Sequence, residues 1–209
     1  MTELEHFQAT LAHRPHGRIL AKANFTPNLS KRLQERYGVS NNGEVMRKLG
    51  FFCPVNVRPA ATESTPKPDF SAYYTDIDMP EGTQVNDIGV MKVPAGFYHF
   101  TGMVSPLRNA TTMEEIRAFP YPVYEGYDES GLAERVEAAH RDGRVACGAV
   151  GHIFESSWQV RGMEPFLEDM VLAPERCEYI FDRFHEYRKS LACAAARAGV
   201  DYIHTGDDV

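Results

Sequence analysis

The sequence has little of what marks several large classes of protein. Its 209 residues contain no uninterrupted apolar run near the roughly 20 residues of a membrane-spanning helix. Lys and Arg number 22 against 29 Asp and Glu and form no dense cluster, so the positive surface that nucleic acids and anionic membranes require is missing. The four cysteines lie far apart, without the spacing of a disulfide framework or a zinc module. We therefore expect a cytoplasmic protein that binds a small molecule, not nucleic acid or a membrane.

The overall composition is that of a globular chain with a substantial core. Hydrophobic residues make up 43% and charged residues 24% of the sequence, which contains no internal repeat or low-complexity tract. We expect a single domain over residues 1–209. The chain is shorter than the about 250 residues of a complete (β/α)₈ barrel, a difference that matters for the fold expected below.

Strand-like and helix-like segments alternate in the first part of the chain. Residues 18–25 predict a buried strand, and Thr26 with Pro27 predicts that a helix begins directly after it. Leucines at helical spacing continue this helix to Gly38. A short helix over residues 44–49 and a strand over residues 51–57 are expected next.

The middle of the chain has a different character. Over residues 73–108 the helical period disappears, and turn signals separate strand-like runs at 88–93 and 97–101. We expect this segment to be a β-excursion carried on a barrel loop. Thr112 and Glu115 then form the capping box of a short helix. A further helix is expected over residues 128–142, ended by Gly143.

The last third of the chain returns to alternation. Residues 144–150 are small and apolar, as is typical of a strand buried on both faces of a parallel sheet. Two helices, over 164–172 and 175–198, separate it from a strand over 200–205. These elements predict an α/β fold. An end directly after a strand predicts that the neighbouring strands come from continuing sequence or from another chain.

Three segments in this order resemble the uroporphyrinogen decarboxylase superfamily. They are Val85–Pro122, Gly151–Glu175 and Ala198–Asp208, and the resemblance covers about three quarters of the chain. That superfamily contains the haem-pathway decarboxylase and methyltransferases linked to a corrinoid or a coenzyme. The resemblance implies a TIM (β/α)₈ barrel of the uroporphyrinogen decarboxylase type, truncated to its first half, and a full-length form that is an enzyme.

The resemblance leaves the reaction open. The haem-pathway decarboxylase binds its carboxylate-rich substrate through arginines of an N-terminal Met-Arg-Gln-Ala-Gly-Arg loop, whereas residues 21–27 here contain Lys22 as their single basic side chain. We therefore favour methyl transfer or O-demethylation from a small ether, amine or thiol-linked donor to a corrinoid or thiol. Decarboxylation of a carboxylated small molecule such as uroporphyrinogen is one alternative. A catalytically silent half-barrel that binds a partner is another.

Cofactors and partners are also implied by the resemblance. In the methyltransferases, a zinc ion held by His and Cys side chains of the later strands acts as a Lewis acid. Zinc and a corrinoid protein are therefore expected for the full-length enzyme, while the metal ligands within this chain stay unknown. A half-barrel exposes sheet edges, so a homo-oligomer or a complementary half-barrel chain is a further expectation.

Candidate site residues follow the predicted strands directly, because barrel enzymes place their chemistry at the carboxyl ends of strands. His204, Asp207 and Asp208 lie at the end of the last strand and are candidate catalytic residues, as metal ligand, base or substrate contact. Alternatively, Asp207 or Asp208 lies in a strand-to-loop turn and caps the following helix. Asn24 and Phe25 end the first predicted strand and are candidates for substrate binding, or alternatively turn and packing residues.

A second group of candidates follows the strand over residues 144–150. His152 and Glu155 are candidate catalytic residues, as an acid/base pair or as metal ligands. Trp158 and Arg161, slightly further on, are candidates for substrate binding. The alternative is that His152 packs in a satisfied position while Glu155 and Arg161 pair to hold the loop.

Overall fold

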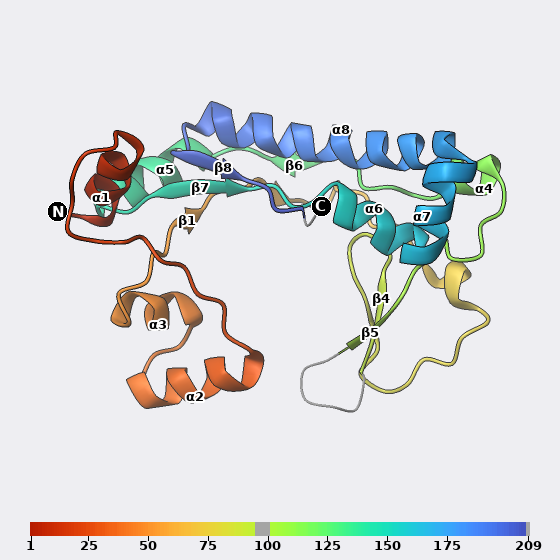
Figure 1. The fold of residues 1–209 in the computed structure, drawn as a ribbon, viewed down its shortest axis with the longest axis horizontal. Helices are drawn as coiled ribbons and strands as arrows, with labels where there is room; N and C mark the ends of the chain where they lie inside the picture. Colours follow the sequence, from red (N-terminus) through yellow and green to blue (C-terminus); the bar gives the residue numbers. More distant parts are fainter. Residues whose placement is uncertain (95–100, 208–209) are drawn as a thin grey trace. The chain divides into compact units, whose positions relative to one another are not determined.

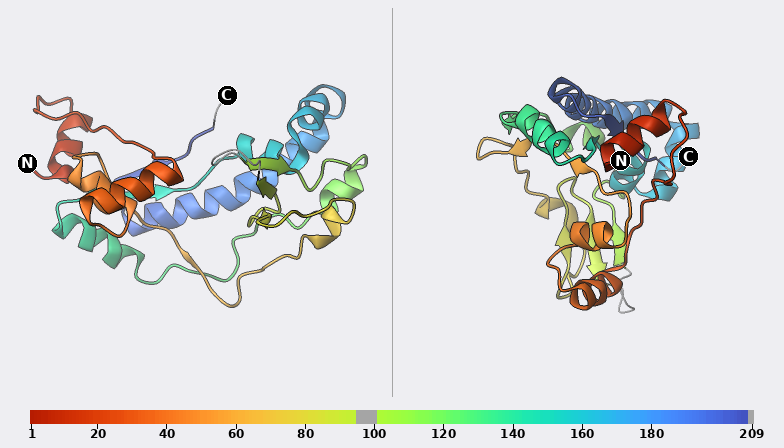
Figure 2. Two further views of the ribbon diagram at one scale, coloured as in Figure 1. Left: turned by 90° about the horizontal axis from the view of Figure 1, so that it is seen from below. Right: turned by 90° about the vertical axis from the view of Figure 1, so that its left-hand side faces the viewer.

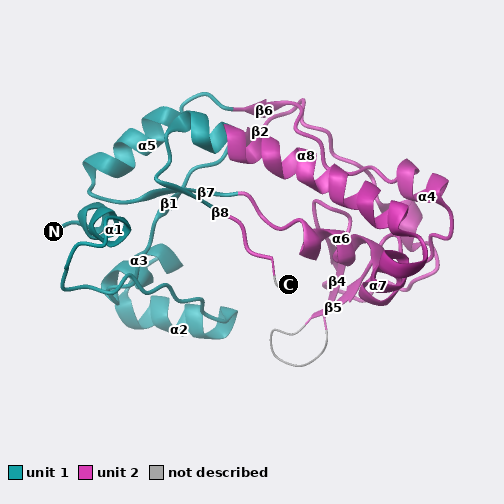
Figure 3. Ribbon diagram, turned by 45° about the horizontal axis from the view of Figure 1, so that its top comes forward, with its two compact units in different colours: residues 1–59, 129–149, 194–203 teal, residues 60–128, 150–193, 204–209 magenta. Residues whose placement is uncertain are grey.

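The computed structural model describes residues 1–94 and 101–207. Over these residues the fold is mixed α/β, with helices and small sheets, none of which closes into a barrel. The chain divides into two compact units, which we describe one at a time (Figure 3). Unit 1 comprises residues 1–59, 129–149 and 194–203, and unit 2 comprises residues 60–128, 150–193 and 204–209.

A parallel sheet lies in unit 1, apart from its last residue, His204 (Figure 1). Its strands are adjacent in the order in which they occur along the chain: β1 (Val55–Asn56), β7 (Ala146–Ala149) and β8 (Tyr202–His204). These strands confirm, with narrower bounds, those predicted over residues 51–57, 144–150 and 200–205. The sequence pattern thus located the strands that precede His152 and Asp207.

Backbone hydrogen bonds give the direction of each pairing. β1 and β7 are parallel, with Val55 opposite Ala146. Asp201 donates its N–H to the Ala146 carbonyl over 2.9 Å, and further along both strands Val150 donates its N–H to the His204 carbonyl over 3.0 Å. Because the residue numbers rise together, β7 and β8 are also parallel.

The helices of unit 1 begin and end largely where local signals place them. They are α1 (Glu3–Leu11), α2 (Pro27–Tyr37), α3 (Asn42–Lys48) and α5 (Leu132–Arg141), and α2 and α3 pack against each other (Figure 2). Gly38 ends α2 in the left-handed conformation, with φ of 60°. Thr26 precedes Pro27 as predicted, but its side chain makes no capping hydrogen bond.

The strand predicted over residues 18–25 is wrong. The side chain of Ile19 is 89% exposed, so this apolar segment is not buried in a sheet. Phe52 donates its N–H to the Ala21 carbonyl over 2.7 Å, but residues 18–25 are not part of any described strand. A short apolar run does not by itself specify a strand, because burial and a pairing partner decide its conformation.

The long helix α8 (Pro174–Ala198) approaches β7 closely within unit 1. A methyl group at Gly148 would lie 2.5 Å from Cβ of Ala195, nearer than two carbons can approach. Gly148 is buried, and the pair of small residues therefore sets the distance between helix and strand. This explains the small residues in the predicted strand over 144–150.

Unit 2 combines short antiparallel sheets with helices. It contains β2 (Ala60–Ala61), the 3₁₀ turn η1 (Ser71–Tyr74), β3 (Gln84–Val85), β4 (Met91–Pro94), β5 (Thr101–Val104), α4 (Met113–Ala118), β6 (Tyr127–Asp128), α6 (Phe154–Arg161), α7 (Met163–Leu172) and most of α8. The antiparallel sheet β3-β4-β5 confirms the predicted β-excursion. The strand predicted over residues 97–101 lies outside the described residues, except for Thr101.

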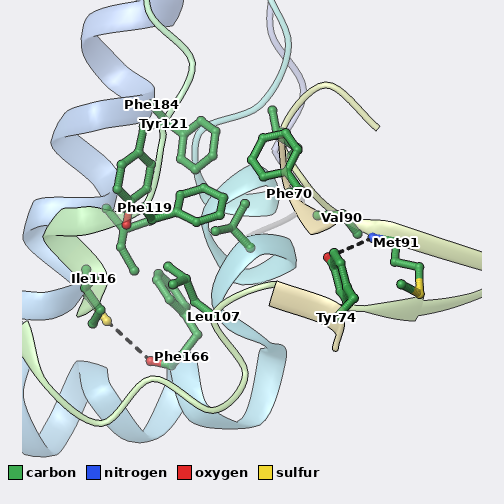
Figure 4. Packing of buried hydrophobic residues seen from close by; sticks show 14 residues of the cluster. Phe70, Tyr74, Val90, Met91, Leu107, Ile116, Phe119, Tyr121, Phe166 and Phe184 are labelled. Atoms are coloured by element: carbon green, nitrogen blue, oxygen red, sulfur yellow. Dashed lines mark hydrogen bonds between the residues drawn. The ribbon is translucent and has the colours of Figure 1, made fainter. Parts of the chain in front are cut away.

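Aromatic side chains pack together with aliphatic ones in the core of unit 2 (Figure 4). Tyr121 contacts Phe119 and Phe184 edge to face, with ring centroids 4.9 and 6.0 Å apart. The buried hydroxyl of Tyr74 accepts a hydrogen bond from Met91 N–H over 3.2 Å and donates to backbone carbonyls. Burial raises the pKa of Tyr74 to about 12, so the phenol stays protonated and donates.

The predicted capping box is confirmed, because Thr112 and Glu115 bond to each other's backbone N–H at the start of α4. Helix α6 was not predicted from the sequence. None of the helices in residues 1–94 and 101–207 combines the length and apolarity needed to cross a bilayer.

Candidate functional site

The loop after β7 brings three of the predicted catalytic residues together in unit 2. Nδ1 of His152 lies 3.2 Å from Oε2 of Glu155 and 3.8 Å from Oδ1 of Asp207. Gln159 donates to the other oxygen of Glu155 over 2.8 Å and holds that carboxylate in place. The side chains of His152 and Glu155 are 41% and 34% exposed, while Nδ1 of His152 is itself buried and has no hydrogen-bond partner among the described residues. An imidazole beside a carboxylate is suited to moving a proton.

Asp207 forms the N-terminal cap of α6. Its Oδ2 accepts hydrogen bonds from Ile153 N–H over 2.9 Å and Phe154 N–H over 3.2 Å, while Oδ1 accepts from Glu155 N–H over 3.0 Å. Burial by itself would raise the pKa of Asp207, but the three N–H donors and the nearby His152 outweigh it and lower that pKa. The carboxylate is therefore ionised and positions the loop that carries His152 and Glu155.

Replacing Asp207 by alanine is expected to lower the free energy of unfolding by about 0.5–2 kcal/mol, the usual effect of losing a helix cap. Asp207→Asn should cost less, because its amide oxygen still accepts one or two of the N–H bonds. Urea unfolding of the full chain measures both, with Asp78→Asn, an exposed loop aspartate, as the matched control. Equal stabilities for the Asp207→Ala and Asp78→Asn variants would contradict the capping role.

The capping interaction of Asp207 also predicts that the free energy of unfolding depends on pH. The pKa of Asp207 is lower in the folded than in the unfolded chain, so its stabilising contribution is complete above the unfolded value of about 4. That contribution is lost as the pH falls through the folded pKa. The stability difference between the natural chain and Asp207→Asn should therefore shrink below about pH 4. A difference that stays constant from pH 7 to pH 3 would exclude this linkage.

His204 lies next to the same cluster. It is the last residue of β8, its side chain is exposed, and its carbonyl accepts the N–H of Val150. A methyl group at Gly206 would lie 3.4 Å from Cε1 of His152 and 3.7 Å from Cε1 of His204. Both imidazoles therefore lie against this glycine. Asp208, the remaining predicted catalytic residue, lies outside the described residues.

Arg161 and Trp158 contact other residues of unit 2. Arg161 is buried, and its Nε donates to Oδ2 of Asp169 over 2.7 Å, while its Nη1 donates to the Leu107 carbonyl over 2.7 Å. The alternative pairing of Arg161 with Glu155 is therefore wrong. Trp158 is half-buried and packs against the aromatic core of unit 2. The buried contacts of Arg161 assign its side chain to the support of α6.

A separate pocket of about 570 Å³ lies in unit 1 and contains the remaining predicted substrate-binding residues. Its lining combines the segment over residues 22–25 with parts of α3, β1 and β7: Lys22, Ala23, Asn24, Phe25, Asn42, Gly43, Met46, Phe52, Cys53, Pro54, Asn56, Cys147 and Ala149. Asn56 and Ala149 are the last residues of β1 and β7. The pocket therefore includes the carboxyl ends of two parallel strands, where α/β folds place ligands.

The polar groups of this pocket are mainly hydrogen-bond donors. The side-chain oxygen of Asn42 accepts from Gln34 Nε2 over 2.9 Å, and that of Asn56 accepts from Ala149 N–H over 3.0 Å. The amide NH₂ group of each asparagine is thus left for a ligand. Lys22 adds an ammonium group, and the lining contains neither Asp nor Glu.

The buried thiol in this lining is poorly suited to act as a nucleophile. Burial raises the pKa of Cys147, in spite of a hydrogen bond with Tyr202 and the nearby Lys22, which lower it. Its thiol is therefore protonated at neutral pH. Cys147 lines the pocket as a small apolar group.

The predicted catalytic residues that the structure describes do not form a zinc site. Over residues 1–94 and 101–207, no three His, Cys, Asp or Glu side chains gather closely enough to hold a metal ion. His152, Glu155 and Asp207 do not fit such a site, because Asp207 directs its oxygens to three backbone N–H groups. We therefore derive no chemical step through zinc.

Lys22, Asn42 and Asn56 supply the hydrogen-bond donors described above, and sequence reasoning did not select them as site residues. The rule that selected His152 also applies to Asn56, because it lies at the end of a predicted strand. Asn42 does not end a predicted strand. Its role as a donor depends on the hydrogen bond from Gln34 to its side-chain oxygen, which the sequence does not predict.

Comparisons of the chain with models of protein families, with curated proteins and with solved structures find no match.

Proposed function

We propose that this chain is the part of a uroporphyrinogen decarboxylase-type barrel that binds a small-molecule methyl donor, for transfer of its methyl group to a corrinoid or thiol. The observation that carries the proposal is the strand order β1-β7-β8, in which parallel strands are neighbours in chain order. A singly wound (β/α) barrel has this order throughout, and a doubly wound sheet has it within each half. Long helical connections precede and follow β7, as such a fold requires.

The positions of the polar residues support an enzyme. His152 and Glu155 follow β7, Asp207 follows β8, and the donor-lined pocket includes the last residues of β1 and β7. Barrel enzymes place their catalytic and binding residues at these carboxyl ends. A silent binding module gives no reason for an exposed imidazole to lie 3.2 Å from a carboxylate oxygen.

The pocket favours methyl transfer over uroporphyrinogen decarboxylation. Lys22 is the one cationic side chain in its lining, and a single ammonium does not neutralise a substrate with many carboxylates. When a methyl group leaves an ether or amine, the donor oxygen or nitrogen gains a proton. Within unit 2, His152 lies next to Glu155 and is suited to proton transfer of this kind.

A methyl-transfer assay tests this proposal. The full chain is incubated with 4-methoxybenzoate and cob(I)alamin, and methylcobalamin formation is followed by absorbance. We expect turnover that His152→Ala lowers by about 100-fold or more, within the range for loss of a general acid. Asp182→Ala, an exposed helix substitution, serves as the control. Absence of methyl transfer together with release of carbon dioxide from uroporphyrinogen would overturn the proposal in favour of decarboxylation.

A further inference from the structure

We infer that the unit 1 pocket binds a monocarboxylate with a flat apolar body, and that Lys22 and the amide groups of Asn42 and Asn56 bind its carboxylate. The inference rests on the proposed function in that it makes this carboxylate the methyl donor. Binding of the carboxylate is, however, measurable without any transfer of a methyl group.

The charged side chain that lines the pocket favours an anionic ligand. The chain carries a formal net charge of −7, yet a lining of thirteen residues contains one Lys and neither Asp nor Glu. Lys22 has no ion pair or hydrogen bond within residues 1–94 and 101–207. A cation left unpaired in a concave surface of an acidic protein favours an anionic ligand.

The orientation of the two amides is the second argument. Gln34 and Ala149 donate to the oxygens of Asn42 and Asn56, so each amide is fixed with its oxygen occupied by the protein. Each NH₂ group is then available to donate. These two NH₂ groups and the Lys22 ammonium are complementary to a carboxylate, whose oxygens only accept.

The apolar part of the lining indicates the rest of the ligand. Phe25, Met46, Phe52 and Pro54 present rings and a thioether, and the protonated thiol of Cys147 adds a further apolar contact. Aromatic and thioether groups pack well on a flat ring. A volume of about 570 Å³ lies within the range of small-molecule pockets. One cation and this apolar surface together predict one carboxylate on an aromatic or similarly flat body.

A pocket of similar volume in unit 2 has the opposite character. It measures about 530 Å³ and is lined by residues of the segments 66–74 and 79–87, including Asp69 and Asp87 beside Lys67. Ser71 N–H and Oγ both donate to Asp69, which lowers its pKa and keeps it negative. Carboxylates in the lining repel an anionic ligand, so this pocket provides a contrast within the same chain.

Isothermal titration calorimetry of the full chain tests the inference directly. The probes are 4-methoxybenzoate and benzoate, with the neutral 4-methoxybenzamide and inorganic phosphate as comparisons. We expect both carboxylates to bind, and the neutral amide and phosphate to bind about tenfold more weakly or worse, the equivalent of losing one charge-assisted hydrogen bond. Equal affinity for 4-methoxybenzamide would overturn the role of the carboxylate, and tighter binding of phosphate would overturn the ligand class.

Variants then assign the carboxylate to particular side chains. Lys22→Met should weaken 4-methoxybenzoate binding about tenfold or more, while Lys22→Arg should retain most of it. Asn56→Asp keeps the oxygen that accepts Ala149 N–H but replaces the donor by an anion, so it should weaken binding at least as much. Lys31→Met, on the exposed surface of α2, is the control and should bind like the natural chain. Unchanged affinity in Lys22→Met would refute the inference.

The two proposals fail in different ways. If carboxylates bind through Lys22 but no methylcobalamin forms, the pocket stands and the methyl-transfer function fails. If methylcobalamin forms equally well from 4-methoxybenzoate and 4-methoxybenzamide, methyl transfer stands and the inference about the carboxylate fails.

Discussion

Replacing Asp169 by alanine is expected to lower the free energy of unfolding by about 3–5 kcal/mol, the effect of removing one partner from a buried ion pair. The Asp169 side chain is 6% exposed and accepts from Nε of Arg161 over 2.7 Å and from Nη1 of Arg176 over 2.9 Å. The variant would leave the guanidinium of Arg161, also 6% exposed, without its charge partner. Because Arg161 ends α6, the loss should also loosen the helix that carries Glu155.

Urea unfolding of the full chain measures this effect. Asp182→Ala, on an exposed position of α8, is the matched control and should change stability by about 0.5 kcal/mol or less. Asp169→Asn should fall between the two variants, because it keeps the shape and one acceptor but loses the charge. An Asp169→Ala variant as stable as Asp182→Ala would show that the ion pair contributes nothing to the fold.

Replacing Gly148 by alanine is expected to cost about 1–3 kcal/mol, the usual cost of overpacking a core. The added methyl would lie 2.5 Å from Cβ of Ala195, so β7 and α8 must separate. Both groups belong to well-packed backbone elements and cannot rotate away. Thermal unfolding followed by circular dichroism detects the loss as a lower midpoint.

A second substitution separates steric clash from other causes. Ala195→Gly removes the methyl that Gly148→Ala would meet, although by itself it costs about 1 kcal/mol of helix propensity. We expect the double variant to be more stable than the sum of the single effects predicts, with a favourable coupling of about 1 kcal/mol or more. Strict additivity would show that the contact between Gly148 and Ala195 does not limit the packing.

The elements that sequence reasoning located are those specified by local physics. The small apolar run over residues 144–150, the capping box of Thr112 and Glu115 and the stop at Gly38 each depend on neighbours in the sequence. The strand expected over residues 18–25 failed because its burial depends on distant parts of the chain. Helix α6 escaped notice because its cap, Asp207, lies more than 50 residues away in the sequence.

In the candidate site, too, some features could be predicted from the sequence, while others depend on distant contacts. The rule that chemistry lies after parallel strands selected His152, Glu155 and Asp207, and the structure brings them together. The rule does not separate a proton-transfer group from a positioning group, and the three N–H bonds to Asp207 make that distinction. Asn42 and Asn56 act as donors because Gln34 and Ala149 occupy their side-chain oxygens. The sequence composition does not predict these hydrogen bonds.

The central claim is that a ligand binds at the carboxyl ends of β1 and β7, and nuclear magnetic resonance tests it most directly. With ¹⁵N-labelled full chain, 4-methoxybenzoate should shift the side-chain amide signals of Asn42 and Asn56, and Lys22→Met should suppress those shifts. Signals of Asn86, which lines the acidic pocket of unit 2, should not move. Shifts at Asn86 with none at Asn42 and Asn56 would contradict the account.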